Sequence, residues 1–174
     1  MVDVNPTAAA LLGLLHGGEA TGYQLWDAAR MFIGDFWTVT RSQAYRELAK
    51  LAAHGMVEAQ PTRARSARPY RLTDSGRAAF AEWLAVPPGP ENIRFPLLLA
   101  LSFGRFLDDD RLLEYVAEHR SAHAERLRRY QEFDADPMFD KYQRSTLRFG
   151  LHYERAVLAW MDELPGILRP VDDD

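Results

Sequence analysis

The chain has 174 residues, of which 47% are hydrophobic and 26% charged, a composition that fits one or two globular domains and excludes a disordered chain. It has no cysteine, which excludes disulfide frameworks and thiolate metal sites, and its net charge of −4 argues against a general polyanion binder. The apolar run near the N-terminus is short and interrupted by glycines, so we expect neither a signal peptide nor a membrane span.

The first half of the chain predicts a helix, a second helix, a third helix, a β-hairpin and a fourth helix, in that order. The first helix covers residues 7–15, with Thr7 as its cap, and ends at Gly17-Gly18. Thr21 precedes the second helix, whose apolar residues recur on one side: Leu25, Trp26, Ala29 and Phe32. Both segments therefore fit helices that pack into one core.

The third helix has the clearest local signals. Thr40 and Gln43 have the spacing of a capping box at its start, and Gly55 supplies the left-handed residue at its end. The predicted buried stripe follows the helical repeat: Ala44, Leu48, Leu51 and Ala52.

The opposite face of this helix combines small residues with long hydrogen-bond donors. Advancing about 100° per residue from Ala44 places Ser42, Arg46, Ala49 and Ala53 on the far side, with Gln43 and Lys50 beside them. Small residues permit the close approach, and long donors the reach to base edges, that binding in a DNA major groove requires. An ordinary solvated face is the alternative, and taken alone the helix would favour it.

The hairpin that follows decides between these interpretations. Residues 56–60 and 68–73 predict two strands joined by the basic tip PTRARSA. Residues 38–71 hold seven arginines and lysines against two glutamates, a local balance of +5, whereas residues 85–174 have a balance of −5. Concentrated positive charge indicates a polyanion site. A flexible, solvated loop is the alternative for the tip.

A fourth helix starts at Thr73, with Phe80, Trp83 and Leu84 on its apolar side, and completes the layout of a winged helix-turn-helix. The fold class we predict is mainly α with a small two-stranded β-wing. Its domains are residues 1–84, a proline-rich linker at 85–92 and an α-helical domain at 93–174.

The C-terminal domain predicts helices only. They cover residues 95–106, then 108–133 after a cap at Asp108, and 138–164, with a break at 135–137 and a tail from Pro165. Two of these three helices are long, and the first is apolar nearly all round. Three such helices do not easily form a closed globular domain by themselves. We therefore expect a symmetric homodimer in which these helices cross between subunits.

Three segments of the N-terminal half resemble the PadR family of transcriptional regulators. They are GLLHGGEATGYQL, FWTVTRSQAYRELAKLAAHGMVEA and RPYRLTDSGRAAFAEWL. The residues that match the family pattern are Gly22, Tyr23, Tyr45, Leu48, Leu51, Gly55, Met56, Val57, Tyr70, Leu72, Thr73, Gly76 and Trp83. The helical C-terminal half resembles the family's dimerisation domain less strongly. Many members have Gly-Thr-Leu-Tyr where this chain has Ser42-Gln43-Ala44-Tyr45, so base contacts are not carried across.

The resemblance implies a repressor that binds double-stranded DNA at a palindromic operator as a dimer and is often released by a small effector. We expect it to be cytoplasmic, since a chain without cysteine suits a reducing cytosol. A candidate effector pocket lies where the C-terminal helices meet the DNA-binding domains. Its candidate residues, for which core or interface packing is the favoured alternative, are Trp83, Phe95, Leu98, Phe103 and Trp160.

We assign base-edge contacts to Ser42, Gln43 and Arg46. Contacts to phosphate or to the minor groove are assigned to Arg41, Tyr45, Lys50, Arg63, Arg65 and Arg68. A winged-helix scaffold that binds protein without contacting DNA is the alternative function.

The motifs of nucleophilic enzymes, phosphate loops and zinc proteases are absent from the sequence, so we expect no enzyme and no cofactor. His119 and His123 are four residues apart on one predicted helix, a spacing that can bind a metal. They have no third ligand nearby in the sequence, and packing or solvation is the favoured interpretation. We predict no metal site.

Overall fold

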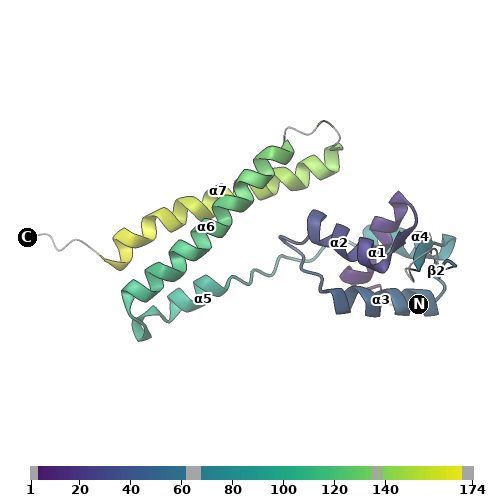
Figure 1. Cartoon of the computed structure of the whole chain (residues 1–174), viewed down its shortest axis with the longest axis horizontal. Coiled ribbons are helices and arrows are strands. Elements are labelled where there is room, and N and C mark those ends of the chain that lie inside the picture. Colours follow the sequence, from purple (N-terminus) through teal and green to yellow (C-terminus); the bar gives the residue numbers. More distant parts are fainter. Residues whose placement is uncertain (1–3, 62–67, 135–136, 138, 170–174) are drawn as a thin grey trace, which may run out of the picture. The chain divides into compact units, whose positions relative to one another are not determined.

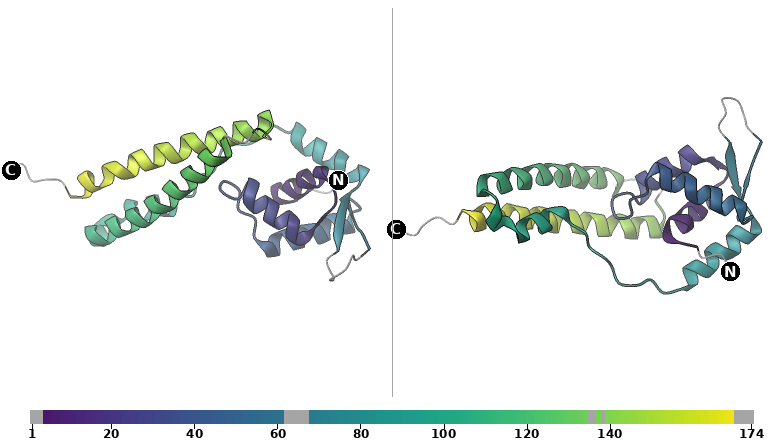
Figure 2. Two further views of the ribbon diagram at one scale, coloured as in Figure 1. Left: turned by 45° about the horizontal axis from the view of Figure 1, so that its top comes forward. Right: turned by 90° about the horizontal axis from the view of Figure 1, so that it is seen from below.

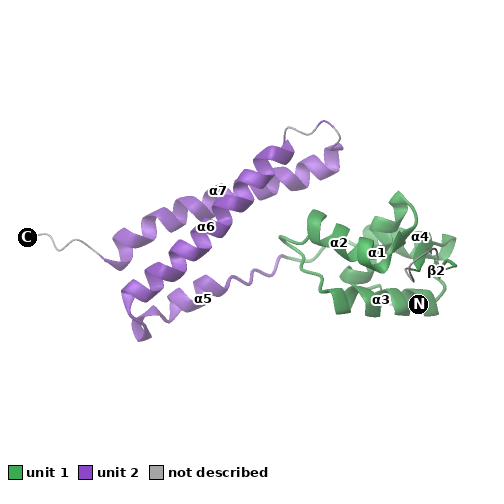
Figure 3. Cartoon of the chain, in the orientation of Figure 1, with its two compact units in different colours: residues 1–90 green, residues 91–174 purple. Residues whose placement is uncertain are grey.

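The computed structural model describes residues 4–61, 68–134, 137 and 139–169. The chain divides into two compact units, residues 1–90 and 91–174 (Figure 3). Each unit is described by itself below.

Unit 1 contains four helices around one apolar core (Figure 1). They are α1 (Pro6–Leu14), which continues into the short 3-10 helix η1 (Leu15–Gly17), α2 (Gly22–Phe32), α3 (Arg41–Ala53) and α4 (Asp74–Ala85). The core comes mainly from the first three: Leu11, Leu12, Leu25, Ala44 and Leu48 are at most 2% exposed. The predicted buried stripe of the third helix therefore faces this core.

The sheet of unit 1 has three strands where the sequence predicted two. They are β1 (Ala20–Thr21), β2 (Val57–Ala59) and β3 (Pro69–Leu72), arranged in the order β1-β3-β2 with both pairings antiparallel. The additional strand is only two residues long, too short for any alternation of apolar and polar residues to reveal it. It pairs Ala20 with Tyr70 and so ties the start of α2 to the wing.

The cap of the first helix lies two residues before the residue that the sequence predicted. Asn5, not Thr7, is its cap, because the Asn5 Oδ1 atom accepts a hydrogen bond from the Ala8 N–H at 3.0 Å. Pro6 then occupies the first helical position, where its missing N–H costs nothing.

Thr73 and Gly76 join the wing and the start of α4 to the turn that ends α3. The Thr73 hydroxyl caps α4 by accepting from the Gly76 N–H at 3.1 Å, and it lies 2.7 and 2.9 Å from the carbonyl oxygens of Gly55 and Met56. A Cβ atom at residue 76 would overlap the Met56 carbonyl oxygen. Glycine is therefore required there, and it allows α4 to pack directly on the turn that ends α3.

Unit 2 contains α5 (Pro96–Ser102), the short 3-10 helix η2 (Gly104–Phe106), and the long helices α6 (Asp109–Asp134) and α7 (Lys141–Leu168). The two long helices lie side by side in every view (Figures 1 and 2). One end of this pair packs around Leu97, Val116, Met161 and Leu164, all at most 5% exposed.

Three predicted boundaries in unit 2 are wrong. The last helix begins at Lys141, after its cap Asp140, and not at residue 138. The segment expected as one helix over 95–106 leaves the α-helical path after Ser102 and continues as η2. The last helix does not stop before Pro165 but includes it and ends at Leu168. Its final turn closes because the Arg169 N–H donates to the Pro165 carbonyl at 3.1 Å.

Candidate nucleic-acid interface

The exposed face of α3 is built on a complete capping box. The Thr40 hydroxyl accepts from the Gln43 N–H at 3.2 Å, and the Gln43 Oε1 atom accepts from the Thr40 N–H at 2.9 Å. The Thr40 hydroxyl also lies 3.0 Å from Gln43 Oε1. The oxygen of Gln43 is thus occupied at the helix start, and its amide NH₂ group is what remains to meet a base.

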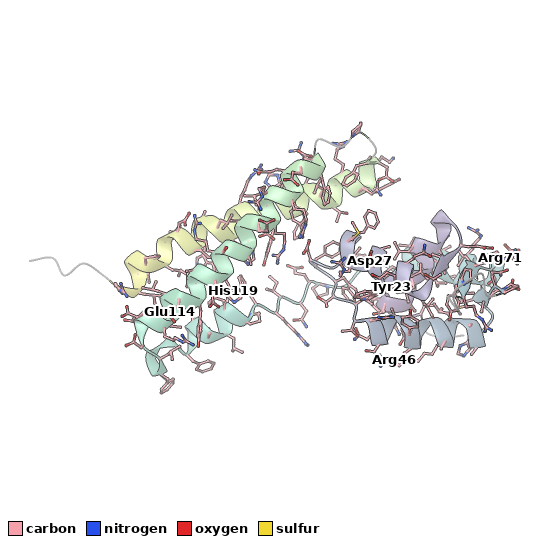
Figure 4. The ribbon with its side chains drawn as sticks, viewed as in Figure 1. Tyr23, Asp27, Arg46, Arg71, Glu114 and His119 are labelled. Carbon is pink, nitrogen blue, oxygen red and sulfur yellow. The ribbon has the colours of Figure 1, made fainter. Side chains whose placement is uncertain are left out.

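Exposure along α3 separates two faces as the helical repeat predicts. Ala44, Leu48 and Leu51 are at most 3% exposed. The outward residues, all in the exposed class, are Arg41, Ser42, Tyr45, Arg46, Ala49, Lys50 and Ala53. Figure 4 labels Arg46 on the side of α3 that points away from the other helices of unit 1. Of the six residues on α3 that were assigned to DNA, five are therefore exposed and the sixth, Gln43, is half-buried.

Two tyrosines hold Arg41 at the N-terminal end of this face. Its guanidinium lies 5.6 Å from the ring centre of Tyr23, on α2, and 5.6 Å from that of Tyr45. Tyr45 approaches α2 closely because residue 22 is glycine, where a Cβ atom would lie 2.9 Å from the Tyr45 ring. Tyr23 was not among the residues assigned to DNA, although the Gly22-Tyr23 pair was part of the resemblance.

Glu47 is the largest departure from the predicted face. In the sequence it is one of the two acidic residues of the basic segment, but in the structure it is buried, with 5% of its surface exposed. Its Oε2 atom accepts from Asn5 Nδ2 at 2.9 Å, and its Oε1 atom accepts from Lys50 Nζ at 3.1 Å and lies 3.5 Å from Arg46 Nε.

The surroundings of Glu47 keep it ionised. Burial on its own raises the pKa of a carboxyl group. Here the hydrogen bonds from Lys50 and Asn5, the charge of Lys50 and the contact with Arg46 outweigh burial, and the pKa of Glu47 lies below its ordinary value. A charged carboxylate is therefore present directly behind the exposed face.

The wing contributes one described cation to the assigned set. Arg68 is exposed where β3 begins, whereas the predicted contacts at Arg63 and Arg65 lie outside the described residues. Arg71, on β3, forms an ion pair with Glu58 across the hairpin at 2.7 Å. That pairing offsets one of the positive charges counted in the basic segment.

The five candidate effector residues fall into different units. Trp83 belongs to unit 1, and the other four belong to unit 2. Within unit 2, Phe95 and Trp160 meet edge to face with ring centres 5.9 Å apart. Leu98 and Phe103 are 43% and 57% exposed. The structure therefore brings Phe95 and Trp160 into contact.

A buried charged cluster lies next to Phe95, between α6 and α7. His123 Nδ1 and Glu154 Oε2 are 2.5 Å apart, and Arg126 donates to Glu154 Oε1 at 3.0 Å. His123 is 6% and Glu154 2% exposed. His123 was among the candidate residues from the sequence, but Glu154 was not. Glu154 occupies the position between Leu151 and Leu158 in the apolar repeat of α7.

Within the described part of the chain, no group of three or more candidate metal ligands is found around His119 and His123 or elsewhere. Among the described residues, none of the helices has both the length and the apolar character needed to cross a membrane.

Both halves of the chain match models of known families. Residues 11–82 match the transcriptional regulator PadR-like family, and residues 93–169 match the virulence activator alpha C-terminal family.

Two curated relatives are transcriptional regulators. The negative transcriptional regulator PadR of Bacillus subtilis is 35% identical over 98 residues, which cover 54% of this chain and 54% of PadR. The alignment thus spans about half the length of that relative. The probable transcriptional regulator Rv1176c of Mycobacterium tuberculosis is 27% identical over 92% of this chain and 96% of its own length.

Solved structures share the fold of the chain. Bacillus subtilis PadR in complex with operator DNA has a TM-score of 0.77 at 24% identity, covering 95% of this chain and all of that one. The same protein in complex with p-coumaric acid has a TM-score of 0.69 at 26% identity, covering 98% and 99%. The virulence activator AphA of Vibrio cholerae has a TM-score of 0.72 at 28% identity, covering 93% and 97%.

Proposed function

Because the chain belongs to the PadR-like family of transcriptional regulators, we propose that it is a cytoplasmic repressor that binds a palindromic DNA operator as a homodimer. The observation that supports DNA binding best is the outward face of α3. It combines exposed alanines with the long donors of Arg46 and Lys50, on a helix whose other face is anchored in the core. A major groove accepts such a helix, and phosphates on either side attract its cations.

In this proposal Ser42, Gln43 and Arg46 meet base edges. Arg41, Tyr45, Lys50, Arg63, Arg65 and Arg68 meet phosphates or the minor groove. The arrangement at Arg41 supports a phosphate role, since its guanidinium is held near the positive N-terminus of α3. Gln43 donates from its NH₂ group, which leaves its oxygen in the capping box.

The homodimer is proposed from the apolar surface of unit 2. Large side chains stand exposed on and around α5, namely Ile93, Leu98, Leu99, Phe103 and Phe106, each at least 43% exposed. A second copy of the chain packed on this surface would remove these side chains from water. The resulting two-fold axis would relate the α3 helices of the two subunits. Those helices then fit successive major grooves about 34 Å apart, which requires a palindromic site.

Release by a small effector is the remaining part of the proposal. Bacillus subtilis PadR has been solved with p-coumaric acid, and we assign the corresponding role here to an aromatic acid that binds near Phe95 and Trp160. Such a ligand acts only if it binds more tightly to the conformation that cannot hold DNA.

A salt titration of DNA binding tests the proposed function. Duplexes are first selected from random DNA with the full-length protein, and affinity is then measured by fluorescence anisotropy between about 50 and about 200 mM salt. Affinity should fall by about 1000-fold or more, since a dimer with six or more phosphate contacts releases that many counterions. Negligible affinity for all DNA at low salt would instead favour the protein-binding scaffold.

Arg46→Ala tests the assignment of a base contact. The variant should lose roughly 1–3 kcal/mol of binding free energy on the selected duplex and much less on random DNA. Arg77→Ala, which removes an exposed arginine from α4, is the matched control and should change neither. An equal loss on both duplexes would show that Arg46 contacts phosphate only.

A further inference from the structure

Glu47 connects Asn5, the cap of α1, to Arg46 and Lys50, two of the long cations on the exposed face of α3. One of its carboxylate oxygens, Oε2, is held by Asn5 Nδ2 at 2.9 Å. The other, Oε1, holds Lys50 Nζ at 3.1 Å and lies 3.5 Å from Arg46 Nε. Lys50 and Arg46 therefore share the acceptor atom Oε1, and the hydrogen bond from Asn5 fixes the position of that carboxylate.

The support behind Glu47 is rigid. Asn5 is the cap of α1, and its Oδ1 atom accepts from the Ala8 N–H at 3.0 Å, so its NH₂ group can point only toward Glu47. The Glu47 side chain is also 93% buried, which leaves it few alternative rotamers. A buried carboxylate that Asn5 anchors keeps its place while the Arg46 and Lys50 side chains move.

The cations in front are free to reach outward. The Arg46 and Lys50 side chains remain 61% and 57% exposed despite their contacts with Glu47. Arg46 meets the carboxylate through Nε, which leaves its two terminal NH₂ groups for a base edge. An arginine held at Nε has fewer conformations to lose when it binds, and pre-organisation of this kind improves affinity for the matching site.

We propose that Glu47 is a positioning residue that directs Arg46 and Lys50 toward DNA and thereby sets the discrimination between operator and other sequences. The inference rests on the proposed function, because it requires that the exposed face of α3 contacts DNA. It assigns a role in recognition to a buried acidic residue that itself never touches the nucleic acid.

Simple electrostatics predicts the opposite change in DNA affinity when the charge of Glu47 is removed, so the inference can be tested. A negative charge near DNA repels phosphates, so removing it should tighten binding to any duplex. If Glu47 instead positions Arg46 and Lys50, removing its charge should weaken binding to the operator relative to random DNA. The ratio of the two affinities therefore distinguishes positioning from repulsion.

The test compares the full-length wild type with Glu47→Gln on two duplexes, one selected from random DNA by the wild type and one scrambled from it. Glutamine keeps an oxygen for Asn5 but turns an NH₂ group toward Arg46 and Lys50, and it preserves volume. We expect the affinity ratio to fall about fivefold or more, as for coupled contacting residues, with scrambled-duplex affinity unchanged or higher.

Two further measurements isolate the mechanism. In an Arg46→Ala, Lys50→Ala background, Glu47→Gln should change the ratio no further, because no side chain remains to be positioned. Glu82→Gln removes the same charge from an exposed position on α4 and should leave the ratio as in the wild type. A full loss in the double-alanine background would overturn the inference.

A second variant covers the case in which Glu47→Gln does not fold, as judged by circular dichroism. Asn5→Ser keeps a good helix cap but removes the donor that anchors Glu47, and it should lower the ratio in the same direction. Wild-type binding with an unchanged ratio in the folded variant overturns the inference alone. Absence of wild-type DNA binding at low salt overturns it together with the proposed function.

Discussion

Glu154→Ala is expected to destabilise unit 2 by about 3–5 kcal/mol, the range for removing one partner of a buried ion pair. Glu154 is 2% exposed and accepts from both His123 and Arg126. Alanine would leave the buried His123 ring nitrogen without its Glu154 partner, remove one acceptor of the Arg126 guanidinium, and open a cavity beside them. Thermal and urea unfolding of the full-length protein, followed by circular dichroism, measure the loss.

Glu163→Ala is the matched control for that change, since Glu163 lies on the same helix but is exposed. It should alter stability only slightly. The pair His123→Leu with Glu154→Leu should recover much of the loss, because well-packed apolar residues often replace a buried ion pair at little cost. If Glu154→Ala unfolds at the temperature of Glu163→Ala, the cluster contributes nothing and its burial is incidental.

Local signals were readable from the sequence because they act within a few residues. The Thr40–Gln43 capping box, the cap at Thr21 and the left-handed Gly55 depend only on their own turn of chain. The buried stripe of α3 was equally predictable, because burial there follows the helical repeat. The mainly α fold with a winged helix, and the resemblance to the PadR family, were confirmed on the same segments.

Features that need a distant partner were not readable. Strand β1 exists because Ala20 and Thr21 meet β3 about fifty residues later. Glu47 and Glu154 looked like ordinary surface acids, because a glutamate in an apolar repeat is usually interpreted as the edge of the stripe. Each is buried only because a donor from another helix reaches it: Asn5 for the first, His123 for the second.

Gln43 has two predicted roles, in the capping box of α3 and in contact with a base, and the sequence does not show which of its atoms serves which role. Gln43 was predicted both to complete the capping box and to read a base. The hydrogen bonds of its oxygen belong to the cap, so only its NH₂ group is left for DNA. A helix start that is fixed in this way limits which bases the residue can recognise, because it can donate but not accept.

Leu48→Ala is expected to destabilise unit 1 by about 2–5 kcal/mol, through lost burial and the cavity that remains. Leu48 is fully buried at the centre of α3, and a Cβ atom at Gly22 on α2 would lie 3.4 Å from its Cδ1 atom. The side chain therefore holds the recognition helix against α2. Urea unfolding monitored by tryptophan fluorescence should show a lower midpoint with an unchanged slope.

Leu84→Ala provides the comparison, because the same substitution at a side chain 60% exposed on α4 should cost far less. Bound operator DNA should raise the melting temperature of Leu48→Ala as it does that of the wild type, since ligands that bind only the folded state stabilise it by mass action. An unchanged melting temperature in Leu48→Ala without DNA would mean that the opposite face of α3 is buried. The assignment of Arg46 and Lys50 to the exposed face of α3 would then be wrong as well, because these residues lie on the face opposite Leu48.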